Sequence, residues 1–399
     1  MSAATAKRAH RPDYPFFLLV AALCLFGLLM ILSAGSVESF KNKGNGHFYF
    51  LEQLKALGIG LVGFYIVQKV HFSFWRKAAV PLMILAVVLL VALFIPGVGF
   101  EYGGATRWID LKIALLQSAE VAKLALVVYL AAWFTKQGKN IADFRENFLP
   151  FVGILGLLAL LVMLQPDMGS MSILALIGLS IFYTAGAPIR HIAYVGGGAI
   201  GAMAFLIAIA PYRINRLLTF LDPAKDTLGT GYHVQQALVA IGSGGLFGLG
   251  FNNSLQKHFF LPEPMNDSIF AIITEELGFF TAGAVIALFA YLAVRGFRIA
   301  RGAPDGFSRL LVTGVVTWIA AQAMINIAAM LSLLPLTGVP LPFISLGGSS
   351  LVVLLVAMGI VMNVSKHTVK YQEAGDERVS RRRRDRRAHR AGSRGFSRA

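Results

Sequence analysis

The chain has 399 residues, of which 56% are hydrophobic and 14% charged, and its formal net charge is +16. Its mean hydropathy of +0.68 lies far above that of soluble globular proteins. This composition excludes an ordinary soluble enzyme and predicts a membrane protein with many spans. The single cysteine, Cys24, excludes an internal disulfide.

Ten apolar runs, each about as long as a membrane-crossing helix, follow one another between residues 15 and 366. The runs are continuously apolar rather than alternating, which indicates helices and excludes barrel strands. Because the fifth to seventh runs are short, nine or eleven spans remain alternatives. The predicted fold class is an all-α polytopic membrane protein with about ten transmembrane helices, at about 15–34, 51–68, 78–97, 113–134, 149–164, 170–187, 192–210, 268–294, 310–334 and 348–365.

The two ends of the chain are expected in the cytoplasm. The first run follows a basic start, but it is too long for a cleaved signal peptide and is expected to remain as the first helix. Ten spans place both termini on one side, and lysine and arginine concentrate in the loops of that side. The chain thus divides into a cytoplasmic segment (1–14), a membrane domain (15–366) and a basic disordered tail (367–399). Attraction of this tail to anionic lipids is favoured over nucleic-acid binding.

One loop, residues 211–267 between helices 7 and 8, is much longer than the others and is predicted to be extracytoplasmic. It contains the amphipathic segment GYHVQQALVAI and the glycine-rich segment GSGGLFGLGFNN. Its apolar content predicts packing on the bundle or at the membrane interface rather than disorder. The glycines do not form a GxGxxG motif in a βαβ context, which excludes a nucleotide-binding loop.

The stretch LPEPMNDSIFAIITEELGFF, residues 261–280, places Asp267 at the start of an apolar run and Glu275 and Glu276 inside it. A helix that starts near Asp267 would place Glu275 about 80° and Glu276 about 180° around its axis. Glu275 would also lie roughly 12 Å along that axis, beyond the about 5–9.5 Å of a glycosidase carboxylate pair. The three groups therefore have separate roles. Asp267 either faces a ligand at the outer boundary or caps the helix, and the two glutamates either pair structurally or face a polar cavity.

A second polar group surrounds the fourth run. Glu120 and Lys123 are three residues apart and share a helix face, so they can pair inside the membrane. Such a pair either sets the helix register or lines a polar cavity. Arg107, which follows two glycines just before the run, is either an interfacial anchor or a fork for a phosphate group. Asp167 in QPDMGS either caps a helix in a tight turn or faces a ligand.

The stretch PLTGVPLPFISLGGSS, residues 335–350, predicts irregular backbone at membrane depth, which is tolerated only against protein or a water-filled cavity. Together with the polar groups around Asp267, Glu120 and Asp167, this stretch indicates a cationic cavity that opens outward and holds one exposed carboxylate. A proton-coupled transporter would instead favour acidic residues near mid-membrane in both halves. The basic residues expected to be unpaired at this cavity are Arg107, Arg213, Arg216, Lys257 and His258.

Over residues 15–366 the chain resembles the SEDS family (shape, elongation, division and sporulation), whose members include FtsW, RodA and SpoVE. The resemblance lies in GATRWI, LQSAEVAKL, QPDMGS, FLDPAKDTLGTGYHVQQALVAIGSGGLFG, LPEPMNDSIFAIITEELG and PLTGVPLPFISLGGSS, which follow in the family's order. GLGFNNSLQKHFFLPE and TGVPLPFIS are closer to the division branch. The family's usual HTDFIFA is replaced by MNDSIFA, and Leu116, Ser118 and Leu346 also depart from the common pattern.

The resemblance implies a ten-helix peptidoglycan glycosyltransferase that polymerises lipid II outside the cytoplasmic membrane of bacteria, during division at the septum. It implies a class B penicillin-binding protein and other division proteins as partners. Asp267 matches the family's essential carboxylate, and Arg107, Glu120 and Lys123 match polar positions of its central cavity. The full set of candidate substrate-binding residues is Arg107, Glu120, Lys123, Asp167, Arg213, Lys257, Glu276 and Ser349.

The expected reaction is an inverting transfer in which Asp267 accepts the proton of the acceptor sugar hydroxyl and undecaprenyl diphosphate leaves. No cofactor is evident in the sequence, and a divalent cation, Mg or Mn, remains open because no ligand cluster indicates one. A lipid II flippase and a non-catalytic scaffold for division proteins remain the alternative functions.

Overall fold

A computed structural model describes residues 11–102, 105–110, 112, 115–209, 220 and 229–368. Two of the basic candidates, Arg213 and Arg216, lie outside these residues, as does the tail beyond residue 368. The predictions made for them stay predictions.

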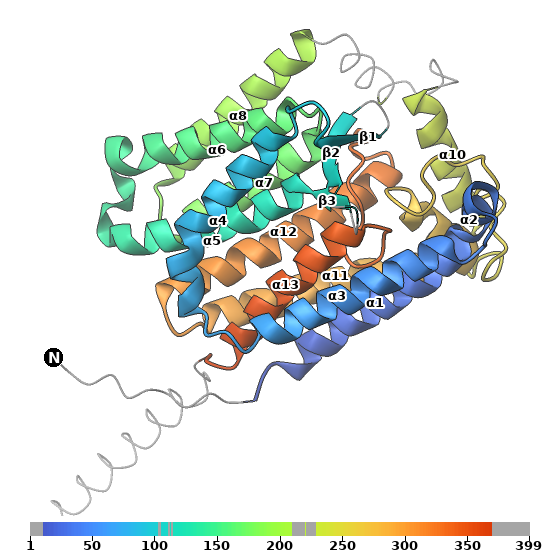
Figure 1. Cartoon of the computed structure of the whole chain (residues 1–399), viewed down its shortest axis with the longest axis horizontal. Coiled ribbons are helices and arrows are strands. Elements are labelled where there is room, and N and C mark those ends of the chain that lie inside the picture. Colours follow the sequence, from blue (N-terminus) through green and yellow to red (C-terminus); the bar gives the residue numbers. More distant parts are fainter. Residues whose placement is uncertain are drawn as a thin grey trace, which may run out of the picture.

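Helices dominate the molecule, and each of the ten apolar runs coincides with one (Figure 1). Among the described residues, eight helices are long and apolar enough to cross a membrane, and α7 is a shorter apolar helix. The fold class is thus confirmed as a helical membrane protein. The ten helices are α1 (Tyr14–Ala34), α3 (Phe48–Val67), α4 (Ser73–Ala92), α5 (Ser118–Gln137), α6 (Leu149–Met163), α7 (Met168–Thr184), α8 (Ile189–Ile209), α11 (Ile269–Arg301), α12 (Gly306–Met330) and α13 (Gly348–Ser365).

Shorter elements connect these helices. The most informative is a three-stranded antiparallel sheet, which the prediction of an all-α chain missed. Trp108 of the middle strand pairs with Gln117, so the fourth helix begins five residues later than the predicted run. The short elements are α2 (Ser36–Lys43), β1 (Gly99–Tyr102), β2 (Ala105–Asp110), β3 (Leu115–Gln117), a 3₁₀-helix (Gly138–Ala142), a π-helix (Phe144–Phe148) and α10 (Thr230–Ser243).

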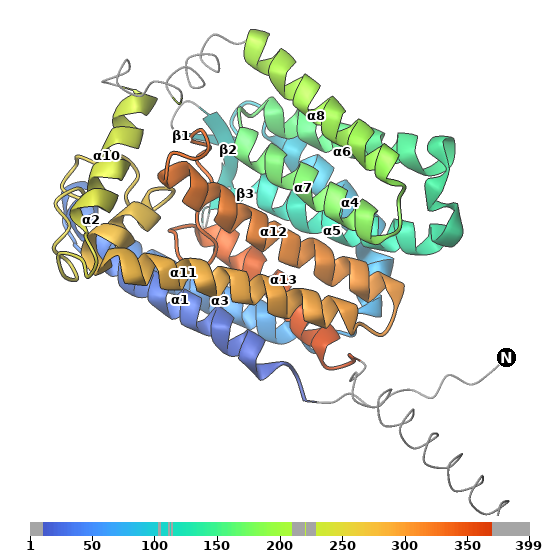
Figure 2. The same ribbon diagram turned by 180° about the vertical axis from the view of Figure 1, so that it is seen from behind.

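The centre of the bundle is α12, which packs against α5, α7, α11 and α13. Figure 2 shows α12 between α7 and α11. In its most apolar stretch 83% of α12 is buried inside the protein, compared with 17% for α4, so α4 faces outward. Helices α3 and α13 approach closely at glycines: a Cβ on Gly359 would lie 2.8 Å from the carbonyl oxygen of Phe64. Small residues at such contacts are typical of helix pairs in membranes.

The start of α1 and the end of α13 lie at the same end of the bundle. The backbone N–H of Asp13 donates to Ser365 Oγ at 3.2 Å, and Arg295 pairs with the carboxylate of Asp13 at 2.9 Å. Figure 1 shows α2, α10 and the strands toward the opposite end. The side of the membrane on which each end lies stays a prediction.

Helix α11 is interrupted at Gly278, where the backbone adopts φ 79° and ψ −179°. The glycine-rich segment 244–250 fills the break. Its Leu249 and Gly250 N–H groups donate to the carbonyls of Glu275 and Glu276, both at 2.9 Å. A Cβ on Gly248 would lie 2.2 Å from the carbonyl oxygen of Glu276. The glycines are therefore needed because two backbones touch, and this part of the long loop packs on the bundle, which is one of the two predicted alternatives to disorder.

Candidate active site

The candidate site surrounds the irregular segment 335–347 between α12 and α13, here called the central loop. Its apolar side chains Val339, Leu341, Phe343 and Ile344 are buried, which confirms that this irregular backbone lies against protein. Amide side chains satisfy its carbonyls: Gln53 of α3 donates to Ser345 at 3.1 Å. Without water, such carbonyls need internal donors. The central loop is therefore a fixed element of the bundle.

Asp267 lies directly before α11, beside the central loop. A Cβ placed on Gly338 would lie 3.9 Å from its Oδ2 atom. Ser268, and not Asp267, occupies the N-cap position, so the alternative of an aspartate helix cap is wrong. Because α11 starts at Ile269, Asp267 precedes the helix, and the angles predicted between Asp267 and the two glutamates around one helix axis do not apply. Asn326 of α12 binds the Asp267 carbonyl at 2.7 Å and the Val339 carbonyl at 2.8 Å. The half-buried carboxylate thus extends from a backbone that is held in place.

Glu120 and Lys123 form the predicted pair on α5, with Lys123 Nζ 2.6 Å from Glu120 Oε1 and both side chains 1% exposed. Lys123 also donates to Gln322 Oε1 at 3.2 Å, and Gln322 Nε2 donates to the Pro340 carbonyl at 3.0 Å. The ion pair is therefore linked to the central loop through one amide. In the part of the chain that the structure describes, Glu120 Oε2 is buried without a hydrogen-bond donor.

Arg107 and Asp167 both contact the turn between α6 and α7. Arg107 donates through Nε to the Gln165 carbonyl at 3.2 Å and through a terminal nitrogen to that of Pro166 at 2.5 Å. Asp167 caps α7 by accepting the Ser170 N–H at 2.9 Å. A Cβ on Gly169 would meet the Thr337 carbonyl oxygen at 3.1 Å. The turn that Arg107 binds and Asp167 caps therefore leads into a helix start that packs against Thr337 of the central loop.

Ser349 lies in the first turn of α13, directly after the central loop. Its hydroxyl accepts the N–H of Gln117 at 3.0 Å. Gln117 is the N-cap residue of α5, so this bond joins the starts of two helices. It places Ser349 beside the entry to the Glu120–Lys123 helix.

Lys257 and Glu276 belong to a different cluster. Lys257, expected to be an unpaired outer cation, is 3% exposed and pairs with Glu276 at 3.0 Å, so that expectation is wrong. The physical reason is that Glu276 is fully buried and requires a countercharge. Glu276 also accepts from Ser33 of α1 at 2.6 Å. Both residues join the 252–257 segment to α1 and α11, and contact with substrate stays a prediction that this geometry does not favour.

Glu275 has the structural role that the sequence left open. It accepts the N–H groups of Leu255 at 2.9 Å and Gln256 at 3.3 Å, together with the hydroxyl of Ser254 at 2.5 Å. Glu275 and Glu276 therefore bind one polar loop from adjacent positions of α11. They are not brought together with Asp267.

Sequence reasoning missed four polar residues that build the site: Gln53, His233, Gln322 and Asn326. The two on α12 carried a usable signal, because amides four residues apart inside an apolar run share one helix face. The other two carried no local signal. His233 of α10 contacts Ser268 Oγ at 2.6 Å, and burial lowers the pKa of this imidazole to about 4.

Residues 14–370 match the model of the FtsW, RodA and SpoVE proteins, described as cell cycle proteins. The chain belongs to the FtsW/RodA/SpoVE family. Stage V sporulation protein E of Bacillus subtilis is 39% identical over 364 residues, which cover 91% of this chain and 99% of that protein. A probable peptidoglycan glycosyltransferase FtsW of Thioalkalivibrio sp. (strain K90mix) is 41% identical, covering 88% of this chain and 89% of the relative.

Solved structures of the FtsW/RodA/SpoVE family share the fold. A chain from a peptidoglycan synthase complex, solved to show how polymerization and crosslinking are coordinated, superposes with a TM-score of 0.75 at 27% identity. This match covers 89% of our chain and 98% of that one. RodA of Thermus thermophilus superposes with a TM-score of 0.66 at 25% identity, covering 90% and 98%.

Two further features bear on what this family member binds. Among the described residues, no three His, Cys, Asp or Glu side chains are grouped so that they could hold a metal ion.

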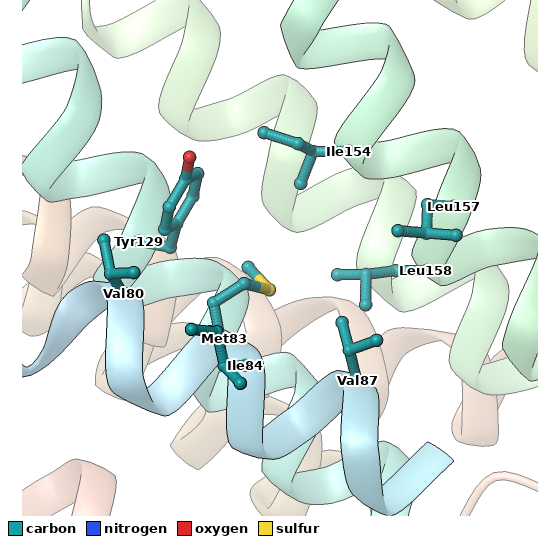
Figure 3. A pocket seen from close by; sticks show the side chains of 8 residues that line it. All are labelled: Val80, Met83, Ile84, Val87, Tyr129, Ile154, Leu157 and Leu158. Carbon is teal, nitrogen blue, oxygen red and sulfur yellow. The ribbon is translucent and has the colours of Figure 1, made fainter. Parts of the chain in front are cut away.

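An apolar groove of about 220 Å³ lies between α4, α5 and α6 (Figure 3). Met83 and Val87 of α4 face Leu158 of α6 across it, and the side chains that line it carry no charge. The groove suits a hydrocarbon chain, and its lining contains no side chain that we assign to catalysis.

Proposed function

We propose that this protein is a peptidoglycan glycosyltransferase that polymerises lipid II into glycan strands at the outer face of the cytoplasmic membrane. The observation that carries the proposal is the half-buried carboxylate of Asp267 on a fixed backbone beside the central loop. The relatives named probable peptidoglycan glycosyltransferase, 41% identical in one case, support the same reaction.

In the proposed mechanism Asp267 is the general base. It accepts the proton of the 4-hydroxyl of the acceptor sugar while that oxygen attacks the anomeric carbon of the lipid-linked donor. The bond from this carbon to the diphosphate oxygen breaks, with inversion, and undecaprenyl diphosphate leaves. Arg107 supplies positive charge for the diphosphate from its half-buried position in β2. Lys123, which is bonded to Glu120 and Gln322, contributes positive charge from the wall of the site.

The test is polymerisation of lipid II by the purified protein and by an Asp267→Asn variant that keeps the fold. We expect the wild-type protein to form glycan strands and the variant to lose at least about 10²-fold in turnover, as for removal of a general base. Turnover near that of the wild type would contradict the assignment. Titration with a chelator, then Mg or Mn, measures whether a divalent cation contributes.

The two alternative functions give different outcomes. A flippase would translocate labelled lipid II in liposomes, independently of Asp267, without making polymer. A scaffold would leave polymerisation unchanged in cells that lack the protein. The hydrogen-bonded groups around the central loop, gathered at one end of the bundle, favour a reaction there over a path across the membrane.

The proposed setting is the inner membrane of a bacterium, at the division septum, with both termini and the basic tail on the cytoplasmic, anionic lipid surface. A class B penicillin-binding protein is the proposed crosslinking partner, and other division proteins are expected with it. The neighbour from a peptidoglycan synthase complex supports this pairing. Lipid II polymerisation with and without a co-expressed class B protein tests it: an unchanged rate contradicts functional coupling.

A further inference from the structure

Helix α10 of the long loop contacts the residue after the candidate base through His233. Its Nε2 atom lies 2.6 Å from the hydroxyl of Ser268, the residue that follows Asp267. Ser268 is fully buried, and α10 packs along α11. Figure 2 shows α10 at the same end of the bundle as the start of α11. The contact therefore joins the extramembrane loop to the backbone that carries Asp267.

The direction of each proton in this contact follows from the partners. The Ser268 hydroxyl donates to the Pro262 carbonyl at 2.7 Å, and a carbonyl can only accept. A hydroxyl has one proton, so Ser268 must accept from His233, whose Nε2 therefore carries hydrogen. Because burial keeps the imidazole neutral above about pH 4, the Nε2–H tautomer is the form present at neutral pH.

Four consecutive residues around Asp267 are each held by a different group. The Met265 carbonyl accepts from the Leu346 N–H at 2.8 Å, and the Asn266 carbonyl accepts from Ser345 Oγ at 2.5 Å. The Asp267 carbonyl accepts from Asn326 at 2.7 Å. Ser268 is held by His233. The first three contacts come from α12 and the central loop, and the fourth comes from α10.

This arrangement places His233 of α10 in contact with the residue that follows the candidate base. Residue 268 begins the first turn of α11, so rotation of its backbone changes where the Asp267 carboxylate points. A displacement of about 1 Å in a reacting group can reduce a rate 10²-fold. We propose that His233 is a positioning residue for Asp267, which orients the carboxylate toward the acceptor hydroxyl by donating a hydrogen bond to Ser268. The inference rests on the proposed function of the same site.

The test compares five variants of the full-length protein in the lipid II polymerisation assay: three at positions 233 and 234, Ser268→Ala, and the double variant of His233→Ala with Ser268→Ala. His233→Ala removes the donor, and His233→Gln retains an N–H that can reach Ser268. Val234→Ala is the matched control, because Val234 is the next residue of α10, is 5% exposed and packs without a polar role. For each variant kcat, KM and the thermal midpoint are measured.

We expect His233→Ala to lower kcat about 10-fold to 10²-fold with KM within about threefold, and His233→Gln to recover most of the loss. Val234→Ala is expected to lower the thermal midpoint without changing kcat. Ser268→Ala removes the same hydrogen bond together with the one to the Pro262 carbonyl, so it should be at least as slow as His233→Ala, and the double variant should be no slower than Ser268→Ala. If His233→Ala does not fold, Ser268→Ala provides the same test.

Four results would overturn the inference: an unchanged kcat in His233→Ala or in Ser268→Ala, no recovery in His233→Gln, or an equal loss in Val234→Ala. Failure of the proposed function looks different, because then the wild-type protein makes no polymer or Asp267→Asn remains active. A protein that depends on Asp267 but not on His233 retains the function and loses this inference.

Discussion

Two parts of one stretch, residues 265–268 and residues 275–276, place carboxylates a few turns apart with opposite surroundings. Glu275 and Glu276 are 1% and 0% exposed, and each accepts several hydrogen bonds from the 252–257 segment or its neighbours. Asp267 is half-buried, and its backbone carbonyl accepts a hydrogen bond from Asn326 at 2.7 Å. Glu275 and Glu276 are held by several donors and stabilise the 252–257 segment, whereas the Asp267 carboxylate extends from a fixed backbone beside the central loop.

The largest expected effect separates these two parts directly. Asp267→Asn should lower lipid II turnover by about 10² to 10⁴-fold, as for loss of a general base, with little change in thermal midpoint. Glu275→Gln should show the reverse: turnover within about threefold and a lower thermal midpoint, because buried donors lose a charged acceptor. Turnover and thermal unfolding of both proteins in detergent measure this. Equal loss of turnover in Asp267→Asn and Glu275→Gln would contradict a catalytic role for Asp267 and a structural role for Glu275.

The second effect concerns the ion pair that the sequence did not predict. Lys257→Met leaves the buried Glu276 without its countercharge, which should cost about 3–5 kcal/mol of stability. Lys55→Met is the matched control, because the Lys55–Glu52 pair is 69% and 45% exposed and such pairs contribute at most about 1 kcal/mol. Thermal or denaturant unfolding compares them. Similar losses of stability in Lys257→Met and Lys55→Met would show that burial does not determine how much the Lys257–Glu276 pair stabilises the protein.

A third effect, of about 3 kcal/mol, follows from His233. Burial lowers its pKa from 6.5 to about 4, so the unfolded chain binds a proton at a pH where the folded protein does not. This stabilisation is complete above pH 6.5 and is lost as the pH falls toward 4, by about 1.4 kcal/mol per pKa unit. Stability measured from pH 7.5 to 4.5 should therefore fall more steeply for the wild type than for His233→Gln. Parallel curves would contradict a buried neutral histidine.

The smallest effect tests the contact at the α11 break. Gly248→Ala should cost about 2 kcal/mol, because the residue has φ +83° and its new Cβ would lie 2.2 Å from the Glu276 carbonyl oxygen. Gly242→Ala, in α10 with open space around it, should instead stabilise by about 0.5–1 kcal/mol. Thermal midpoints of the two variants check the sign of each change. A neutral Gly248→Ala would mean that the two backbones can separate easily.

The helices and the local polar contacts were predictable from the sequence, because they depend on neighbours within one or two turns. The Glu120–Lys123 pair is separated by three residues and forms as expected. Asp167 caps the helix that starts at the next residue. By contrast, Lys257 and Glu276 are 19 residues apart, and Asn326 and Asp267 are 59 residues apart. No period or cap signal links such positions.

The sequence by itself determined that the chain is a membrane protein, where its helices lie and which aspartate stands at the mouth of an apolar run. Hydropathy over about 20 residues is sufficient for this, because a helix in a membrane satisfies its own backbone. Only the tertiary structure decided how the remaining polar groups are satisfied. Packing separated Glu275 and Glu276 from Asp267, paired Lys257 with Glu276, and brought His233 and Asn326 to the residues that hold the base.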